Sequence, residues 1–207
     1  TFLGSRYMSV VWIIGIALLV ISPGQALPFV AVFAAIYFFY QMLPQQRAAK
    51  QIKKAERLLK FGLFEPALVS LEKALLLKTE DKYVYYLKGA CLHNLGRFKE
   101  ATEPLKTYKK AEPNNYDNLL IIANCYFQIE EYAKTIKILQ PIPNTFPRYL
   151  RVLILLGSSY EKQKDYNKAI ETYKKAPLDK KAASPDLEEI RDSLSKLSEN
   201  RKQPSSS

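Results

Sequence analysis

Small and aromatic residues recur along most of this chain at intervals of 34 positions. One series of small residues comprises Ala55, Gly89, Ala123 and Gly157. Two further series keep the same step: Ala67, Ala101, Thr135 and Ala169, and the aromatic Phe64, Phe98, Tyr132 and Tyr166. A repeat of 34 residues is typical of a helix–turn–helix unit. The pattern therefore predicts an all-α fold in which stacked units form an α-solenoid.

The recurring positions divide residues 47–182 into four units, at about 48–81, 82–115, 116–149 and 150–183. Gly62 and Gly96 fall where the turn inside a unit is expected, and glycine suits such a turn because it adopts positive φ readily. Pro141 lies inside the expected second helix of the third unit. Since proline ends a helix, that helix is predicted to stop near Gln140.

The residues at these spacings resemble the tetratricopeptide repeat. The second unit carries the pattern as Tyr85, Gly89, Leu92, Gly96, Phe98, Ala101, Leu105 and Pro113. The fourth carries it as Leu153, Leu156, Gly157, Tyr160, Tyr166, Ala169, Tyr173 and Ala176. One departure is Tyr108, which stands where the family has alanine, so either the packing is wider there or the ring points outward.

A further helix is predicted after the fourth unit, over residues 184–198. Ser184 suits the N-cap of a helix and Pro185 suits its first turn. Leu187, Ile190, Leu194 and Leu197 form one apolar stripe. A terminal repeat needs a cap over its exposed face, and this helix is expected to supply it. Residues 199–207 are predicted to be a disordered tail.

The first part of the chain has a different composition, because residues 7–46 contain no charged side chain. Two apolar segments lie there, at 7–21 and 26–43, separated by turn-forming residues 22–25. The second segment, as a helix, would span about 27 Å, close to the thickness of a bilayer core. Residues 1–46 are therefore predicted to be a membrane anchor. Either both segments insert as a helical hairpin, or the first is a cleaved signal-like segment.

A basic flank follows the predicted anchor, and Arg47, Lys50, Lys54 and Arg57 fall on one face of a helix. Positive residues remain on the cytoplasmic side of a membrane or its organellar equivalent. We therefore expect an integral membrane protein with its repeats on the cytoplasmic, stromal or equivalent side. The basic stripe either contacts anionic lipid headgroups or is an ordinary solvated helix face.

The sequence contains few residues that could support catalysis or bind a metal. The two cysteines, Cys91 and Cys125, occupy equivalent places in adjacent units, too far apart for a disulfide. There is one histidine, and there is neither a metal-ligand pair nor a phosphate loop. We expect no enzyme activity, cofactor or small-molecule substrate. The net charge of +11 favours an acidic partner or surface, but its dispersal along the chain disfavours nucleic acid.

The resemblance implies a concave groove lined by the first helix of each unit, with space for a peptide or helix of a partner protein. The groove positions carried over from the family are Tyr83, Tyr86, His93, Asn94, Leu120, Asn124, Phe127, Gln128, Arg151 and Ile154. Aromatic anchors in a groove are typical of binding hot spots. Alternatively, Tyr86 and Phe127 pack between neighbouring helices.

Together these features predict a membrane-anchored adaptor that binds other proteins and helps to assemble a membrane complex. A constitutive structural subunit of a large membrane complex is the alternative.

Overall fold

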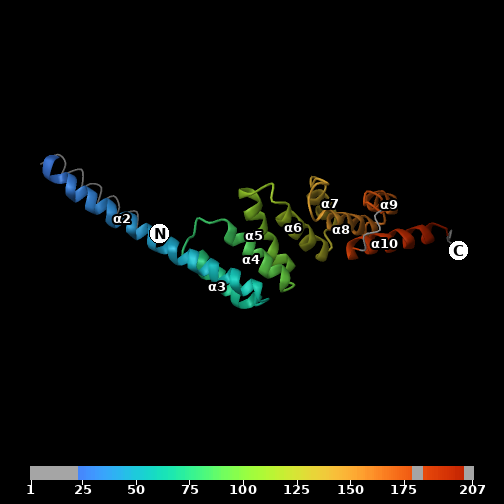
Figure 1. The fold of residues 1–207 in the computed structure, drawn as a ribbon, viewed down its shortest axis with the longest axis horizontal. Helices are drawn as coiled ribbons and strands as arrows, with labels where there is room; N and C mark the ends of the chain where they lie inside the picture. Colours follow the sequence, from blue (N-terminus) through green and yellow to red (C-terminus); the bar gives the residue numbers. More distant parts are fainter. Residues whose placement is uncertain (1–22, 179–183, 203–207) are drawn as a thin grey trace.

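The computed structural model describes residues 23–178 and 184–202. This part of the chain is all helical, in a single row of helices from which the first half of α2 projects (Figure 1). The helices are α2 (Pro23–Lys60), α3 (Phe64–Leu76), α4 (Tyr83–Asn94), α5 (Phe98–Ala111), α6 (Tyr116–Gln128), α7 (Tyr132–Leu139), α8 (Tyr149–Lys162), α9 (Tyr166–Tyr173) and α10 (Pro185–Lys202).

The helices pack as four hairpins, α2 with α3, α4 with α5, α6 with α7, and α8 with α9. Each hairpin packs on the next, and the first helices α2, α4, α6 and α8 also contact one another in sequence. The α-solenoid predicted from the 34-residue period is thus confirmed. It places the first helices side by side along one surface.

Close approach of two helices explains the small residues of the repeat. A Cβ atom added at Gly89 of α4 would collide with Leu105 of α5, and one added at Gly157 of α8 would collide with the ring of Tyr173 on α9. Ala55 and Ala123, at the equivalent places, are completely buried. The period therefore records the positions at which the two helices of each hairpin touch.

The turn within each hairpin uses a left-handed residue at the same place. Gly62 and Gly96 take φ values of 71° and 73°. In the third and fourth hairpins the equivalent residues are Glu130 and Lys164, with φ values of 63° and 62°. Side chains with a Cβ rarely adopt this conformation. The last two turns are therefore more strained than the first two.

Two departures from the repeat pattern have clear outcomes. Helix α7 ends at Leu139, shortly before Pro141, which predicts its early end. Tyr108 is only 7% exposed. Its ring therefore lies inside wider packing and does not point outward.

The predicted capping helix corresponds to α10, which packs on α8 and α9. Leu187, Ile190 and Leu197 are buried with Tyr173 in one apolar cluster. The helix extends to Lys202, beyond the predicted end at residue 198. The predicted disordered tail, 199–207, therefore begins inside α10, and its residues 203–207 lie outside the described part of the chain.

The predicted boundary between anchor and solenoid, at residues 46 and 47, lies inside the continuous helix α2. The predicted apolar segment 7–21 lies outside the described residues, whereas 26–43 is part of α2. Among the residues whose placement is described, we find no helix with both the length and the hydropathy of a membrane span.

Both cysteines are free and buried, as expected from their place in the repeat. Burial raises the pKa of the Cys91 thiol to about 11 and that of Cys125 to about 12. The thiols are therefore protonated at neutral pH and act as small apolar side chains in the core.

Candidate protein-binding groove

The first helices carry all ten predicted groove residues, on α4, α6 and α8. Tyr83, Asn94, Gln128 and Arg151 are exposed. The other six are half-buried, namely Tyr86, His93, Leu120, Asn124, Phe127 and Ile154. The predicted groove residues therefore include exposed side chains from three successive repeats.

Three tyrosine rings form a cluster at the beginning of α4. Tyr83 stacks on Tyr86 with a centroid distance of 5.5 Å. The ring of Tyr108, from the end of α5, lies 5.3 Å from Tyr86 and 6.3 Å from Tyr83. The buried Tyr108 thus packs against the exposed Tyr83 and the half-buried Tyr86. Tyr108 was singled out in the sequence only as a departure from the repeat, and the structure places it against two of the predicted groove residues.

The environment of these rings makes loss of the hydroxyl proton still less favourable than in an exposed tyrosine. Burial raises the pKa of Tyr83, and the negative charge of Glu56 raises it further. Burial also raises the pKa of Tyr86, with a smaller contribution from Asp117. Both phenols are therefore available at neutral pH as hydrogen-bond donors to a partner.

In the middle of the groove, predicted partner-binding groups contact one another. His93 Nε2 lies 2.8 Å from Asn124 Oδ1, a hydrogen bond that joins α4 to α6. The ring of Phe127 packs edge to face on Tyr132 at 5.4 Å. Asn94 donates a hydrogen bond to the carbonyl of Ala90 in its own helix. The His93–Asn124 hydrogen bond therefore joins two repeats, whereas the contacts of Phe127 and Asn94 stay within one repeat.

Two ion pairs connect the α8 region with its neighbours, one with α6 and the other with the capping helix α10. Arg148, just before α8, lies 2.8 Å from Asp117 of α6. Arg151 Nε lies 3.7 Å from Asp186 of the capping helix. All four side chains are at least 30% exposed, so the pairs contribute little to stability. The Arg151 pair was missed in the sequence, because the predicted capping helix does not show which of its side chains meets α8.

The remaining predicted residues either pack on the apolar clusters or are exposed on α2. Leu120 packs on the apolar cluster between α6 and α8, and Ile154 packs on the cluster beneath α10. The predicted membrane-surface residues, Arg47, Lys50, Lys54 and Arg57, are all exposed on α2. Within the described ranges, no group of three or more His, Cys, Asp or Glu side chains could hold a metal ion.

A family profile, described as "Anaphase-promoting complex, cyclosome, subunit 3", matches residues 60–140 and again residues 106–176. Together the two matches span more than half of the chain. Both lie in the repeat region, and their overlap is expected for a sequence built from similar units. No curated protein matches the chain significantly.

The fold is shared with solved structures of MamA. MamA from Desulfovibrio magneticus RS-1 is 24% identical with a TM-score of 0.60, covering 77% of this chain and 98% of that one. A second structure, described as MamA MSR-1, is 18% identical with a TM-score of 0.60, covering 75% of this chain and 87% of that one. At such identities the likeness establishes a tetratricopeptide-type solenoid and leaves partners open.

Proposed function

This chain belongs to the repeat family described as anaphase-promoting complex, cyclosome, subunit 3, and we propose that it is a scaffold whose groove holds a peptide or helix of a partner protein. The observation that carries the proposal is the row of first helices with the tyrosine cluster at its beginning. Tyr83 is 37% exposed and rests on two further rings. A large aromatic surface held in place by its neighbours is the usual anchor of a binding hot spot.

The chemistry along the groove fits a segment that crosses several repeats. Tyr83 on α4 offers an aromatic face, Gln128 on α6 an amide, and Arg151 on α8 a guanidinium group. The amide and the phenol can bond the backbone of an extended peptide or the side chains of a helix. The proposed role is that of an adaptor in complex assembly, without catalytic activity.

We also propose that residues 1–46 anchor the chain in a membrane, with the repeats on the cytoplasmic, stromal or equivalent side. One support is that residues 7–46 carry no charge. The other is that apolar side chains are exposed on the half of α2 that projects from the row of helices. Val32, Ile36, Phe38 and Phe39 are 56–66% exposed. Leaving such side chains in water is unfavourable by about 25 cal/mol per Å², so a cover of lipid would stabilise this half of the helix.

The anchoring proposal predicts resistance to alkaline extraction. Membranes from cells that make the full chain should retain it after carbonate washing, because apolar burial is insensitive to charge and pH. A peripheral protein of known behaviour provides the control. Release of the chain with that control would show that residues 1–46 do not insert.

The scaffold proposal predicts that this chain co-migrates with its partners in substoichiometric amounts. In native gels of membranes solubilised in mild detergent, an adaptor should appear with assembly intermediates and remain scarce in the mature complex. A constant ratio of one copy per mature complex would instead identify a structural subunit. Recovery of the chain alone under several detergent conditions would contradict both roles.

A further inference from the structure

Helix α2 carries a single continuous face that changes from apolar to basic. The residues on it recur at spacings of three and four, which places them in line along the helix. They are Val32, Ile36, Phe39 and Leu43, followed by Arg47, Lys50, Lys54 and Arg57. All eight are exposed. The change from apolar to basic falls at Pro44.

The solenoid lies on the other side of this helix. Ala48, Ile52 and Ala55 are at most 5% exposed and belong to the apolar cluster shared with α3. At about 100° per residue, Ile52 points nearly opposite to Lys50. Glu56 points about 120° away from Lys50. Glu56 occupies the place in the first repeat that Asn124 occupies in the third, so it lies on the groove side. In agreement with this position, its charge raises the pKa of Tyr83. The basic face thus points away from both the core and the groove.

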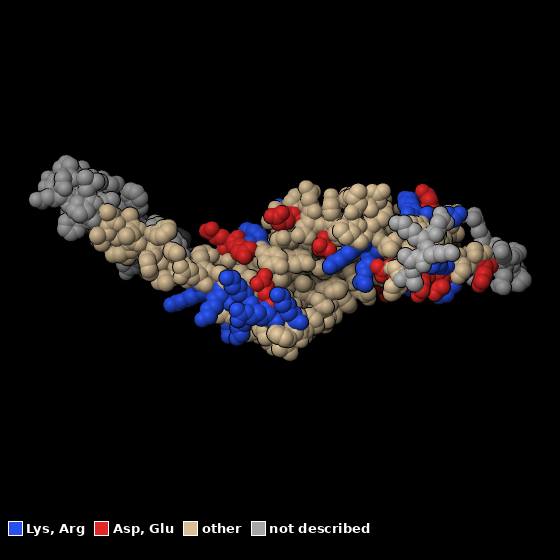
Figure 2. Space-filling model, in the orientation of Figure 1, with Lys and Arg blue, Asp and Glu red and all other residues tan. Residues whose placement is uncertain are grey.

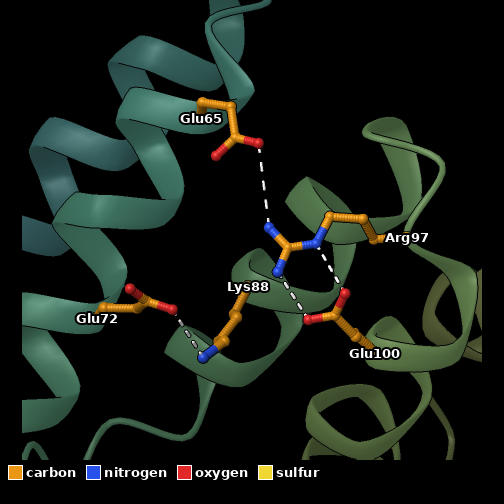
Figure 3. Close-up of polar contacts among 5 residues, drawn as sticks. All are labelled: Glu65, Glu72, Lys88, Arg97 and Glu100. Atoms are coloured by element: carbon orange, nitrogen blue, oxygen red, sulfur yellow. Dashed lines mark hydrogen bonds and ion pairs between the residues drawn. The ribbon is translucent and has the colours of Figure 1, made fainter.

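The cations of this face have no acidic partner among the residues that the structure describes. The nearby acids of α3 are engaged elsewhere, since Glu72 pairs with Lys88 at 3.2 Å and Glu65 lies 4.0 Å from Arg97 (Figure 3). Lysine and arginine side chains gather over the second half of α2 (Figure 2), where Lys53, next to Lys54, is exposed as well. Within the described part of the chain, the basic face of α2 therefore has no negatively charged side chain paired with it.

We infer that the basic face of α2 lies on the headgroups of an anionic bilayer, in an orientation that leaves the groove open. The inference rests on the proposed membrane anchoring. A bilayer is favoured over an acidic protein because the same helix face continues into exposed apolar residues, and a bilayer offers hydrocarbon next to anionic groups. A parallel pair of α2 helices would bring like charges together, which disfavours a second copy of this chain.

The length of α2 requires the helix to lean toward the membrane. Lys54 lies about 16 Å beyond Leu43 along the axis, and Arg57 about 21 Å. Headgroup attraction is screened over about 8 Å at physiological salt, so an upright helix would keep both side chains out of reach. Pro44 removes a backbone hydrogen bond at the junction and permits a bend there. When α2 tilts so that its basic face meets the bilayer, the solenoid on the opposite side of the helix moves away from the bilayer. The groove then does not face the membrane.

Amine footprinting of the full chain tests this orientation. The protein is reconstituted in vesicles of phosphatidylcholine alone, or of phosphatidylcholine with phosphatidylglycerol, and labelled with a membrane-impermeant acylating reagent. Labelling of Lys50 and Lys54 should slow about fivefold or more with phosphatidylglycerol, the equivalent of about 1 kcal/mol per charge. High salt should reverse the effect. Lys82, next to the groove aromatics, and Lys110 on α5 should react equally in both vesicles.

Three results would overturn the inference. Equal labelling of Lys50 and Lys54 in the two vesicles would show that anionic headgroups do not contact the face. Protection of Lys82 would show that the groove faces the bilayer. Equal protection by soluble poly-glutamate with phosphatidylcholine vesicles would identify a site for acidic protein. If anchoring itself fails, the chain instead does not sediment with phosphatidylcholine vesicles, which is a separate readout.

A matched pair of variants assigns the effect to this face. Lys50→Gln, Lys54→Gln and Arg57→Gln together should abolish the phosphatidylglycerol-dependent protection of the remaining reporter, Lys53. The control combines Lys110→Gln, Lys174→Gln and Lys175→Gln, which remove the same charge from exposed positions on the second helices or just after them. The control should retain protection. Similar loss in both variants would attribute the effect to net charge and contradict a specific face.

Discussion

Replacing Gly157 by alanine should lower the free energy of unfolding by about 1–3 kcal/mol. A loss of stability would be informative, because replacing glycine by alanine inside a helix ordinarily stabilises a protein by about 0.5–1 kcal/mol. The added Cβ would collide with the ring of Tyr173, which is 1% exposed. The Tyr173 hydroxyl is also fixed by a hydrogen bond to Glu161 at 2.6 Å, so the ring cannot yield easily. Denaturant unfolding followed by circular dichroism measures the change.

A second variant shows whether the collision is the cause. In a protein that already carries Tyr173→Leu, Gly157→Ala should lower the free energy of unfolding clearly less, because the ring that the new Cβ would meet is absent. Gly89→Ala, which meets Leu105 of α5, should destabilise in the same way as Gly157→Ala. An increase in stability for either glycine variant would contradict the close approach of the helices.

Replacing Tyr83 and Tyr86 together by alanine should weaken partner binding by about 2–4 kcal/mol, because hot-spot losses concentrate in a few aromatic anchors. The two rings are stacked at 5.5 Å and present one surface to the groove. Binding is measured by titration with the partner recovered from the native-gel experiment. Tyr166→Ala is the matched control, since Tyr166 is 51% exposed on α9, a second helix outside the groove.

This comparison decides whether Tyr83 and Tyr86 bind a partner in the groove or mainly support the packing of the solenoid. A double variant that keeps its helical content but loses the partner supports the groove. Unfolding of the double variant would show that the rings mainly support α4 and Tyr108. Normal binding by a folded double variant would place the partner elsewhere, and equal loss in Tyr166→Ala would point to a general effect on the solenoid.

The sequence by itself determined the repeat and its phase. The contact between paired helices is so close that only small residues fit, and it recurs once in each unit, so Gly89 and Gly157 mark it directly. The capping helix was also predictable, because Ser184 and Pro185 signal a helix start and the apolar stripe from Leu187 to Leu197 needs a surface to cover. These signals are local, and each depends on one or two helices only.

Only the tertiary structure decided which predicted groove residues are free. His93 and Asn124 are 31 positions apart and bond to each other because stacking brings α4 beside α6. Tyr108 turned inward because Tyr83 and Tyr86 provide rings for it to pack on. Such pairings depend on contacts between units, and the sequence pattern describes only positions within a unit.

The same distinction applies to α2. Its basic residues and their spacing are visible in the sequence, but the direction of that face is not. It is set by the packing of Ala48, Ile52 and Ala55 on α3, and by Glu56 on the groove side, close enough to raise the pKa of Tyr83. Burial of one face of a helix determines where every other face points. The sequence thus specified which side chains each helix carries, and the packing of the helices decided which of them are exposed.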